Sequence, residues 1–146
     1  MFTKTRFDSL QLPDSIMQGI ASLGWECLTE VQRDTIPLAR SGRDVIGQAR
    51  TGSGKTAAFG IPILERCQPT GSLQGLILAP TRELAIQIEE NFNKYGKFLD
   101  LRMALLYGGV KYGKQLEQLK NEPDIIVATP GRLLDHLSQG NLSLKK

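Results

Sequence analysis

Short apolar runs alternate with helical segments along most of this sequence, and that alternation constrains its fold more than any other feature. Four runs have the length and composition of buried strands, and they lie at residues 44–47, 76–79, 103–107 and 125–128. Each is followed by a loop rich in glycine, proline or threonine and then by residues with helical spacing. Strands and helices that alternate in this way are typical of βα units on a parallel sheet. We therefore expect an α/β fold in which helices flank a parallel sheet.

Two amphipathic helices are expected ahead of the first of these strands. Apolar residues recur at helical spacing over residues 14–23. A second helix is expected to begin at Thr29, because Thr29 and Gln32 have the spacing of a capping box. We assign residues 1–43 to an N-terminal region that holds these helices and residues 44–146 to the βα units.

The composition is that of a soluble globular chain, since 40% of the 146 residues are hydrophobic and 23% are charged. A net charge of +3 is compatible with a nucleic-acid partner but does not by itself indicate one. Cys27 and Cys67 lie far apart in the sequence with no histidine cluster, which argues against a zinc site. No apolar run reaches the length of a membrane span. We expect an intracellular protein with no membrane contact, in the cytoplasm, with the nucleus as the alternative.

A glycine-rich loop follows the first candidate strand and nearly matches the phosphate-binding pattern GxxxxGK(S/T). It departs from the pattern in its first residue and consists of Ala49, Arg50, Thr51, Gly52, Ser53, Gly54, Lys55 and Thr56. Gly52 and Gly54 allow backbone N–H groups to turn toward phosphate oxygens. Lys55 supplies a positive charge to the outer phosphates, and the Thr56 hydroxyl can reach a magnesium ion. The loop predicts that a nucleoside triphosphate binds, but it leaves the reaction open.

Four motifs, in order, resemble those of the DEAD-box ATP-dependent RNA helicases. Residues 49–56 resemble the first helicase motif of that family, in which alanine is the usual first residue. Residues 80–85 look like motif Ia, Gly108-Gly109 looks like the GG motif, and Thr129-Pro130-Gly131-Arg132 looks like motif Ib. The resemblance extends from about Phe7 to Arg132. It implies a RecA-like P-loop NTPase domain, truncated before the DEAD motif.

A fifth resemblance concerns the base of the nucleotide. Residues 24–32 are similar to the Q motif of the family, and Phe7 stands upstream where the family has an isolated aromatic residue. The resemblance implies that the Gln32 amide hydrogen-bonds the adenine edge and that Phe7 packs against the base. Leu28 stands where the family usually has proline. The capping box also accounts for Gln32, and the two roles are compatible.

The same resemblance implies contact with the phosphate backbone of RNA. The three later motifs lie at strand-to-helix turns, where backbone N–H groups and hydroxyls can hold phosphates and arginines can pair with them. Taken singly, each is an ordinary turn with a helix cap. The residues that the family likeness assigns to RNA are Pro80, Thr81, Arg82, Gly108, Gly109, Thr129, Pro130, Gly131 and Arg132.

As a whole, the resemblance implies an ATP hydrolase that clamps single-stranded RNA between two RecA-like domains and separates short duplexes. ATP and Mg²⁺ would be its cofactors, with Lys55 and Thr56 as catalytic residues and Thr56 as the magnesium contact made through the nucleotide. No Asp-Glu-Ala-Asp run, whose carboxylates would hold magnesium and activate water, occurs in the sequence. We expect the second RecA-like domain to lie outside this sequence and the chain to bind nucleotide without efficient turnover.

Two other functions remain open from the sequence. The chain could be a stand-alone nucleotide- or RNA-binding module without ATPase activity. It could also be a P-loop enzyme of another family, such as a DNA helicase or a small-molecule kinase, although those families lack the extension that carries Phe7 and Gln32. The single histidine, His136, lies among leucines of a predicted helix, which favours a structural role over catalysis.

Overall fold

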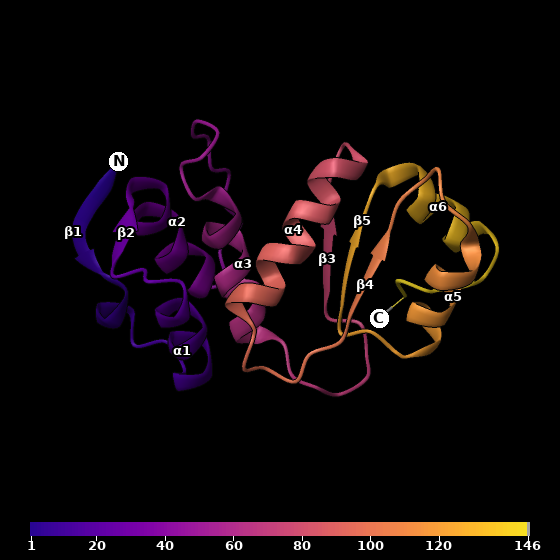
Figure 1. Cartoon of the computed structure of the whole chain (residues 1–146), viewed down its shortest axis with the longest axis horizontal. Helices are drawn as coiled ribbons and strands as arrows, with labels where there is room; N and C mark the ends of the chain where they lie inside the picture. Colours follow the sequence, from indigo (N-terminus) through magenta and orange to yellow (C-terminus); the bar gives the residue numbers. More distant parts are fainter. Residues whose placement is uncertain (146) are drawn as a thin grey trace. The chain divides into compact units, whose positions relative to one another are not determined.

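In the computed structural model, which describes residues 1–145, the chain divides into two units by its internal contacts. Unit 1 comprises residues 1–66 and 91–99, and unit 2 comprises residues 67–90 together with those from Asp100 onward. Figure 1 shows the helices and strands of both units, coloured along the sequence.

Unit 1 is built mainly from helices, together with a small antiparallel strand pair. The pair consists of β1 (Phe2–Arg6) and β2 (Cys27–Thr29). A short 3-10 helix, η1 (Phe7–Leu10), is followed by α1 (Asp14–Ser22), α2 (Glu30–Arg40) and α3 (Lys55–Arg66). Full burial of one large apolar side chain contributes about 1.5–3 kcal/mol. The buried core of the unit includes Phe7, Ile16, Ile20, Leu28, Ile36, Ile61 and Leu64.

Helix α1 approaches the last turn of α4 (Arg82–Tyr95) closely at Gly19. A β-carbon placed on Gly19 would lie 2.2 Å from the carbonyl oxygen of Tyr95. The Tyr95 side chain is buried, and burial raises its pKa to about 12. Trp25 contacts both Tyr95 and Phe7, with ring centroids 5.5 Å and 6.2 Å away. The missing side chain at Gly19 therefore allows α1 to pack directly on the backbone beside this aromatic cluster.

Unit 2 contains a three-stranded parallel sheet, which confirms the predicted α/β fold with helices beside a parallel sheet. Strands β3 (Gly75–Leu78) and β4 (Met103–Leu106) both pair with β5 (Ile125–Ala128), so the strand order is β3-β5-β4. The strands are followed by α4, by α5 (Tyr112–Lys120) and by α6 (Pro130–Ser138), respectively. One face of the sheet contributes to a core cluster of Ala104, Leu106, Ile126, Ala128 and Leu133. Because the strands are parallel, the three loops that follow them lie at one edge of the sheet (Figure 1).

The opposite edge of the sheet is organised by a buried carboxylate, Asp124, immediately before β5. Its side chain accepts hydrogen bonds from the backbone N–H of Arg102 at 3.0 Å and from that of Gly71 at 3.2 Å. The Gln74 side-chain amide donates to the same carboxylate at 3.2 Å. Asp124 thereby holds together the segments that enter β3, β4 and β5, and it satisfies its own hydrogen-bonding capacity despite burial.

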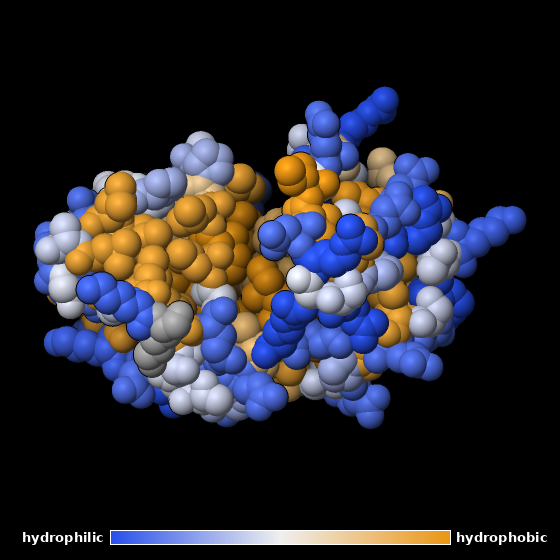
Figure 2. Space-filling model, turned by 180° about the vertical axis from the view of Figure 1, so that it is seen from behind, coloured by the Kyte–Doolittle hydropathy of each residue, from blue (hydrophilic) through white to orange (hydrophobic). Residues whose placement is uncertain are grey.

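Apolar side chains of unit 2 are exposed on β3 and on α6. Strand β3 lies at one edge of the sheet, and within residues 1–145 no strand pairs with its outer side. Leu76 and Leu78 of β3 and Leu134 of α6 are exposed. In Figure 2, which is turned by 180° from Figure 1, a broad hydrophobic area lies on the left, the side on which the sheet then appears. The strand carries none of the charged or proline residues that usually protect an edge strand.

The prediction of a strand at residues 44–47 is wrong. These residues and those up to Arg50 lie outside helices and strands, and Val45 and Ile46 are exposed. A strand is held by hydrogen bonds to a neighbouring strand. Among the described residues, no strand pairs with this segment. The apolar run instead leads as exposed irregular backbone into the glycine-rich loop.

Candidate functional site

The glycine-rich loop leads directly into the first turn of α3, as its sequence predicts. Gly52 and Gly54 adopt left-handed conformations with φ angles of +79° and +86°, which residues with a β-carbon rarely adopt. The Lys55 ammonium folds back over the loop and donates to the carbonyl oxygen of Ala49 at 2.6 Å. The loop and the positive end of α3 are thus open to an anion that approaches from solvent.

The remaining loop residues complete a site that fits a phosphate chain. The Ser53 hydroxyl donates to the carbonyl oxygen of Arg50, which closes a turn inside the loop. Arg50 and Thr51 are exposed, and Thr56 is half-buried in the first turn of α3. Because Gly52 and Gly54 lack β-carbons, phosphate oxygens can approach the backbone N–H groups closely. The residues that would hold phosphates and their magnesium ion are Gly52, Gly54, Lys55 and Thr56.

Gln32 connects the start of α2 to this loop. The predicted capping box is confirmed, because Thr29 N–H donates to Gln32 Oε1 at 3.0 Å and Gln32 N–H donates to Thr29 Oγ1 at 3.4 Å. The same amide donates through Nε2 to the carbonyl oxygen of Gly54 at 3.1 Å. Gln32 is only 2% exposed. A β-carbon on Gly54 would lie 2.4 Å from Gln32 Nε2, so glycine is required there for this contact as well as for its φ angle.

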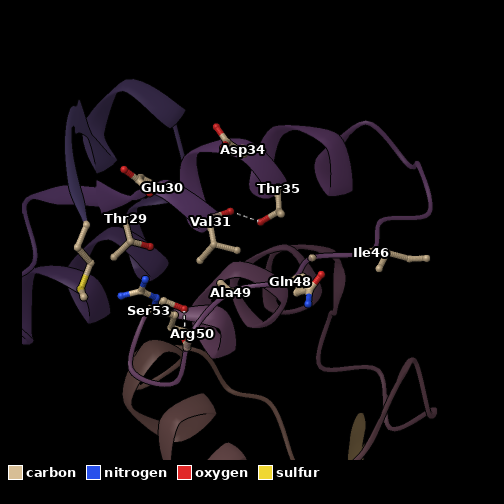
Figure 3. A pocket seen from close by; sticks show the side chains of 12 residues that line it. Thr29, Glu30, Val31, Asp34, Thr35, Ile46, Gln48, Ala49, Arg50 and Ser53 are labelled. Carbon is tan, nitrogen blue, oxygen red and sulfur yellow. Dashed lines mark hydrogen bonds between the residues drawn. The ribbon is translucent and has the colours of Figure 1, made fainter.

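A cavity of about 580 Å³ opens between the first turns of α2 and the loop (Figure 3). On the α2 side it is lined by Thr29, Val31 and Thr35, and on the loop side by Ala49 and Ser53 among others. Figure 3 shows the Val31 side chain directed toward the loop and that of Asp34 directed away from it. The volume lies in the range of small-molecule sites in proteins, roughly 300–1,000 Å³. The cavity therefore has room for a nucleotide base beside the phosphate-binding loop.

Phe7 lies in the core of unit 1 and does not line this cavity. Its side chain is 1% exposed and stacks on Trp25, with the ring planes 23° apart. Its backbone N–H donates to the carbonyl oxygen of Glu26 at 2.9 Å, immediately before β2. In this position Phe7 supports the strand that leads into Thr29.

The turns after β3 and β4 lie together at the carboxyl edge of the unit 2 sheet. The guanidinium of Arg82 lies over the Tyr107 ring, 5.0 Å from its centroid. A β-carbon on Gly109 would lie 3.8 Å from Nη1 of Arg82, and Gly109 has a φ angle of +83°. Thr81 caps α4, because its hydroxyl oxygen accepts from the backbone N–H of Leu84 at 3.3 Å. The exposed residues at these two turns are Pro80, Thr81, Arg82, Gly108 and Gly109.

The turn after β5 joins the same edge. Thr129 N–H donates to the carbonyl oxygen of Leu106 at 2.9 Å, and Pro130 occupies the first position of α6. Gly131 is exposed. Arg132 is half-buried, and its guanidinium lies 4.4 Å from the centroid of the Tyr112 ring. The structure therefore brings all the sequence-predicted phosphate contacts of unit 2 to one edge, with Arg132 held against a neighbouring helix.

Sequence reasoning missed a buried polar network behind these turns. Gln115 of α5 is 3% exposed, and its Oε1 lies 3.0 Å from Nε2 of His136. On the other side of the ring, Nδ1 of His136 lies 3.1 Å from the side-chain amide nitrogen of Asn141. Because that amide nitrogen donates to Nδ1, His136 is neutral with its proton on Nε2, from which it donates to Gln115. The one available signal was Gln115 itself, a polar residue at an inward position of an amphipathic helix.

The pKa of His136 is lowered, first because the ring is buried and second because Arg132 is close, while Asp135 opposes the shift. The folded state therefore binds a proton less readily than the unfolded chain, whose histidine pKa is about 6.5. Stability from this residue is present above about pH 6.5 and is lost as the pH falls through the folded pKa. We expect the free energy of unfolding to drop as the pH falls below about 6.5, and His136→Gln to reduce that drop. Urea unfolding at each pH checks this, and equal slopes for both proteins would contradict it.

Membrane spans and side-chain metal clusters are both missing from the part of the chain that the structure describes. No helix in residues 1–145 is long and apolar enough to cross a membrane. In the same residues, no three His, Cys, Asp or Glu side chains are grouped so that they could hold a metal ion.

Comparison with known sequences gives consistent matches over nearly the whole chain. The family model described as DEAD/DEAH box helicase matches residues 29–146. The chain is 49% identical over 142 residues to the DEAD-box ATP-dependent RNA helicase CshA of Bacillus cereus, a match that covers 97% of this chain and 27% of that protein. It is 47% identical to the CshA protein of Geobacillus kaustophilus, covering 97% of this chain and 30% of that protein. The chain thus spans less than a third of the length of these relatives.

Solved structures give a similar result. The chain is similar to a DEAD box protein from Methanococcus jannaschii with a TM-score of 0.91 and 40% identity, covering 99% of this chain and 40% of that one. It is also similar to a hypothetical ATP-dependent RNA helicase from Sulfolobus tokodaii, with a TM-score of 0.81 and 44% identity, covering 90% of this chain and 38% of that one. These matches support the RecA-like α/β fold that the resemblance to the DEAD-box helicases implies.

Proposed function

This chain belongs to the DEAD/DEAH box helicase family, and on that basis we propose that it forms the ATP-binding and RNA-contacting part of an ATP-dependent RNA helicase. Its relatives of that name are more than three times as long, so the activity of a complete helicase is part of the proposal. We assign nucleotide binding to unit 1 and RNA binding to unit 2.

The observation that carries the nucleotide assignment is the Gln32 amide, which bonds both the cap of α2 and Gly54 of the phosphate loop. Beyond these two bonds, a primary amide still has one N–H donor and one oxygen lone pair, and this pair matches the hydrogen-bonding edge of adenine. The adjacent cavity holds the base in this assignment, and the loop from Ala49 to Thr56 holds the phosphates. Phe7 acts indirectly by supporting β2, and a contact with the base would require its ring to leave the core.

When bound, ATP with Mg²⁺ supplies the free energy of phosphoryl transfer. Within this chain, Lys55 would neutralise charge on the outer phosphates and Thr56 would help to hold the magnesium ion. The sequence has no Asp-Glu-Ala-Asp run to activate water, so we propose that these residues bind nucleotide without efficient turnover. Hydrolysis would need those carboxylates and the second RecA-like domain.

The RNA assignment uses the carboxyl edge of the unit 2 sheet. Backbone N–H groups at Gly108, Gly109 and Gly131 and the hydroxyls of Thr81 and Thr129 are suited to phosphate oxygens. Contacts of this kind hold the backbone of a strand without reading its bases. In the complete helicase, a strand gripped here and by the second RecA-like domain would be separated locally from its complement.

Thermal melting with ADP, GDP or no nucleotide, each with magnesium, tests the nucleotide assignment. A ligand that binds the folded state raises its stability by RT ln(1 + [L]/Kd), about 2.7 kcal/mol at a hundredfold excess over Kd. We expect ADP to stabilise the protein more than GDP does. In Gln32→Ala the shift with ADP should fall to that with GDP, because each lost hydrogen bond is worth about 0.5–1.5 kcal/mol.

The matched control for this experiment is Gln18→Ala, at an exposed position of α1 in the same unit. It should keep the full preference for ADP. The comparison uses the ligand-induced shift and not the melting temperature itself, because Gln32→Ala also removes a capping box, which costs about 1 kcal/mol. Equal shifts with ADP and GDP in the unchanged protein would overturn the adenine assignment.

A further inference from the structure

Gln115 occupies the centre of the network behind the phosphate-binding turns. Its Nε2 donates to the carbonyl oxygen of Tyr107 at 2.8 Å, at the point where β4 passes into the glycine turn. Its Oε1 accepts from His136 Nε2 at 3.0 Å and lies 3.4 Å from Nη1 of Arg132. One buried side chain of α5 therefore bonds both the turn after β4 and the helix after β5.

The chemistry of its neighbours fixes which way the Gln115 amide points. Arg132 can only donate, and His136 donates from Nε2 because its Nδ1 accepts from Asn141. Both donors face Oε1 of Gln115, while the Tyr107 carbonyl can only accept and faces Nε2. A flipped amide would place donors against donors and an acceptor against an acceptor. The network therefore has one arrangement in which these hydrogen-bonding groups are satisfied.

Arg132 is held from three directions. Its guanidinium lies over the Tyr112 ring at 4.4 Å and donates to the carbonyl oxygen of Val110 at 3.1 Å, in addition to its approach to Gln115. Val110 follows the two glycines directly, so Arg132 ties α6 to the far end of the turn whose near end is bonded by Gln115. The main chain from Tyr107 to Val110 is thus fixed at both of its ends.

We propose that Gln115 is a positioning residue for RNA binding. It sets the backbone of the glycine turn and the guanidinium of Arg132 in one arrangement, so that N–H groups of the turn face the same phosphates as the turn after β5. Arg82 joins this arrangement because it lies over the Tyr107 ring. The inference rests on the proposed function, since it deepens the RNA assignment, and it is independent of the nucleotide site in unit 1.

The test compares Gln115→Glu with Gln118→Glu. Both changes add one negative charge to α5, and both residues have a side-chain oxygen that accepts a hydrogen bond. In Gln118→Glu the carboxylate can still accept from Leu105 N–H, which donates to Oε1 at 2.8 Å in the unchanged protein. In Gln115→Glu the bond to the Tyr107 carbonyl is lost and is replaced by repulsion between two acceptors. The readout is the binding of a fluorescent oligouridylate at several salt concentrations.

We expect Gln115→Glu to bind this RNA about tenfold more weakly than Gln118→Glu, as loss of about 1.4 kcal/mol of phosphate contact implies. The slope of log K against log salt should shrink by about 0.7, the value for one phosphate on a single strand. Stabilisation by ADP should be equal in the two variants. A role confined to stability would lower the melting temperature without changing the salt slope.

A second pair of variants decides the matter if Gln115→Glu does not fold. Tyr112→Leu, at a half-buried position, removes the ring that lies 4.4 Å from the Arg132 guanidinium and 5.0 Å from the His136 ring. Both side chains that face Oε1 of Gln115 then lose a packing partner. The variant should weaken RNA binding about threefold, a value in keeping with a cation–π contact of about 0.5–1 kcal/mol. Tyr112→Phe keeps the ring and should restore affinity.

Three results would overturn the inference. One is equal RNA affinity and salt slope for folded Gln115→Glu and Gln118→Glu, and another is unchanged affinity in Tyr112→Leu when Gln115→Glu does not fold. The third is failure of the unchanged protein to bind the oligouridylate, which would also overturn the RNA part of the proposed function. Only the third result would also contradict the proposed function, and it would contradict the RNA part alone. The nucleotide part is tested separately by the melts with ADP and GDP.

Discussion

Replacing Lys55 with alanine should weaken the binding of ADP with magnesium about 100-fold and leave the stability of the free protein within about 0.5 kcal/mol of its original value. The side chain is exposed, and its ammonium is bonded to the Ala49 carbonyl oxygen at the surface of the loop. Its loss therefore removes little from the folded state. When phosphates are bound, each charged hydrogen bond from the Lys55 ammonium to a phosphate oxygen is worth about 1.5–3 kcal/mol. An ammonium can make more than one such bond. Titration calorimetry measures the affinity, and urea unfolding measures the stability.

Lys114→Ala is the matched control for this variant. Lys114 is an exposed lysine of α5, so its replacement changes the net charge by the same amount at a distance along the chain from the loop. Its affinity for ADP should equal that of the unchanged protein. Retained ADP binding in Lys55→Ala would mean that the glycine-rich loop does not hold the phosphates, and the nucleotide assignment would then have to be abandoned.

Replacing Gly19 with alanine should destabilise unit 1 by about 3 kcal/mol, the upper end of the range typical of an overfilled core. The added β-carbon would lie 2.2 Å from the carbonyl oxygen of Tyr95 and 3.0 Å from its carbonyl carbon. Both are backbone atoms, so no side chain can rotate away, and α1 would have to move off the last turn of α4. Urea unfolding followed through the fluorescence of Trp25, which contacts Tyr95, reports on this region.

Gly113→Ala is the matched control, and we expect this glycine-to-alanine change to raise the free energy of unfolding. Gly113 is also a helical glycine, in α5, but a β-carbon there meets no atom within 4 Å. Alanine should stabilise the helix by about 0.5–1 kcal/mol, because it restricts the unfolded chain more than glycine does. Similar losses of stability in Gly19→Ala and Gly113→Ala would show that the close approach of α1 to Tyr95 is not what limits this position.

Features set by neighbours in the sequence could be predicted from it. The capping box depends on Thr29 and Gln32, three residues apart, and it forms as expected. The parallel sheet follows from repeated strand–loop–helix units, and the parallel direction of its strands brings the predicted turns to one edge. The conformation of the phosphate loop could also be predicted locally, because glycine is favoured where the backbone takes a positive φ angle, as it does at Gly52 and Gly54.

Features set by distant parts of the chain could not be predicted in this way. The run at residues 44–47 has the composition of a strand, but pairing requires a neighbour that no sequence pattern reveals. Strand β2 has only three residues and was missed because its partner, β1, begins at Phe2. Gln115 and His136 looked like ordinary residues of two separate helices, and their roles depend on the packing that brings those helices together.

The two hydrogen bonds of the Gln32 side-chain amide bear on the entropy cost of binding a base. In the free protein this amide already has a fixed orientation, because Thr29 N–H and the Gly54 carbonyl hold its two ends. Immobilising a glutamine side chain takes up to about 2 kcal/mol of conformational entropy. Here that entropy is lost when the chain folds, so under the proposed function a bound base would lose no affinity to the ordering of this side chain. A glutamine free to rotate at the same place would present the same atoms and bind the same base more weakly.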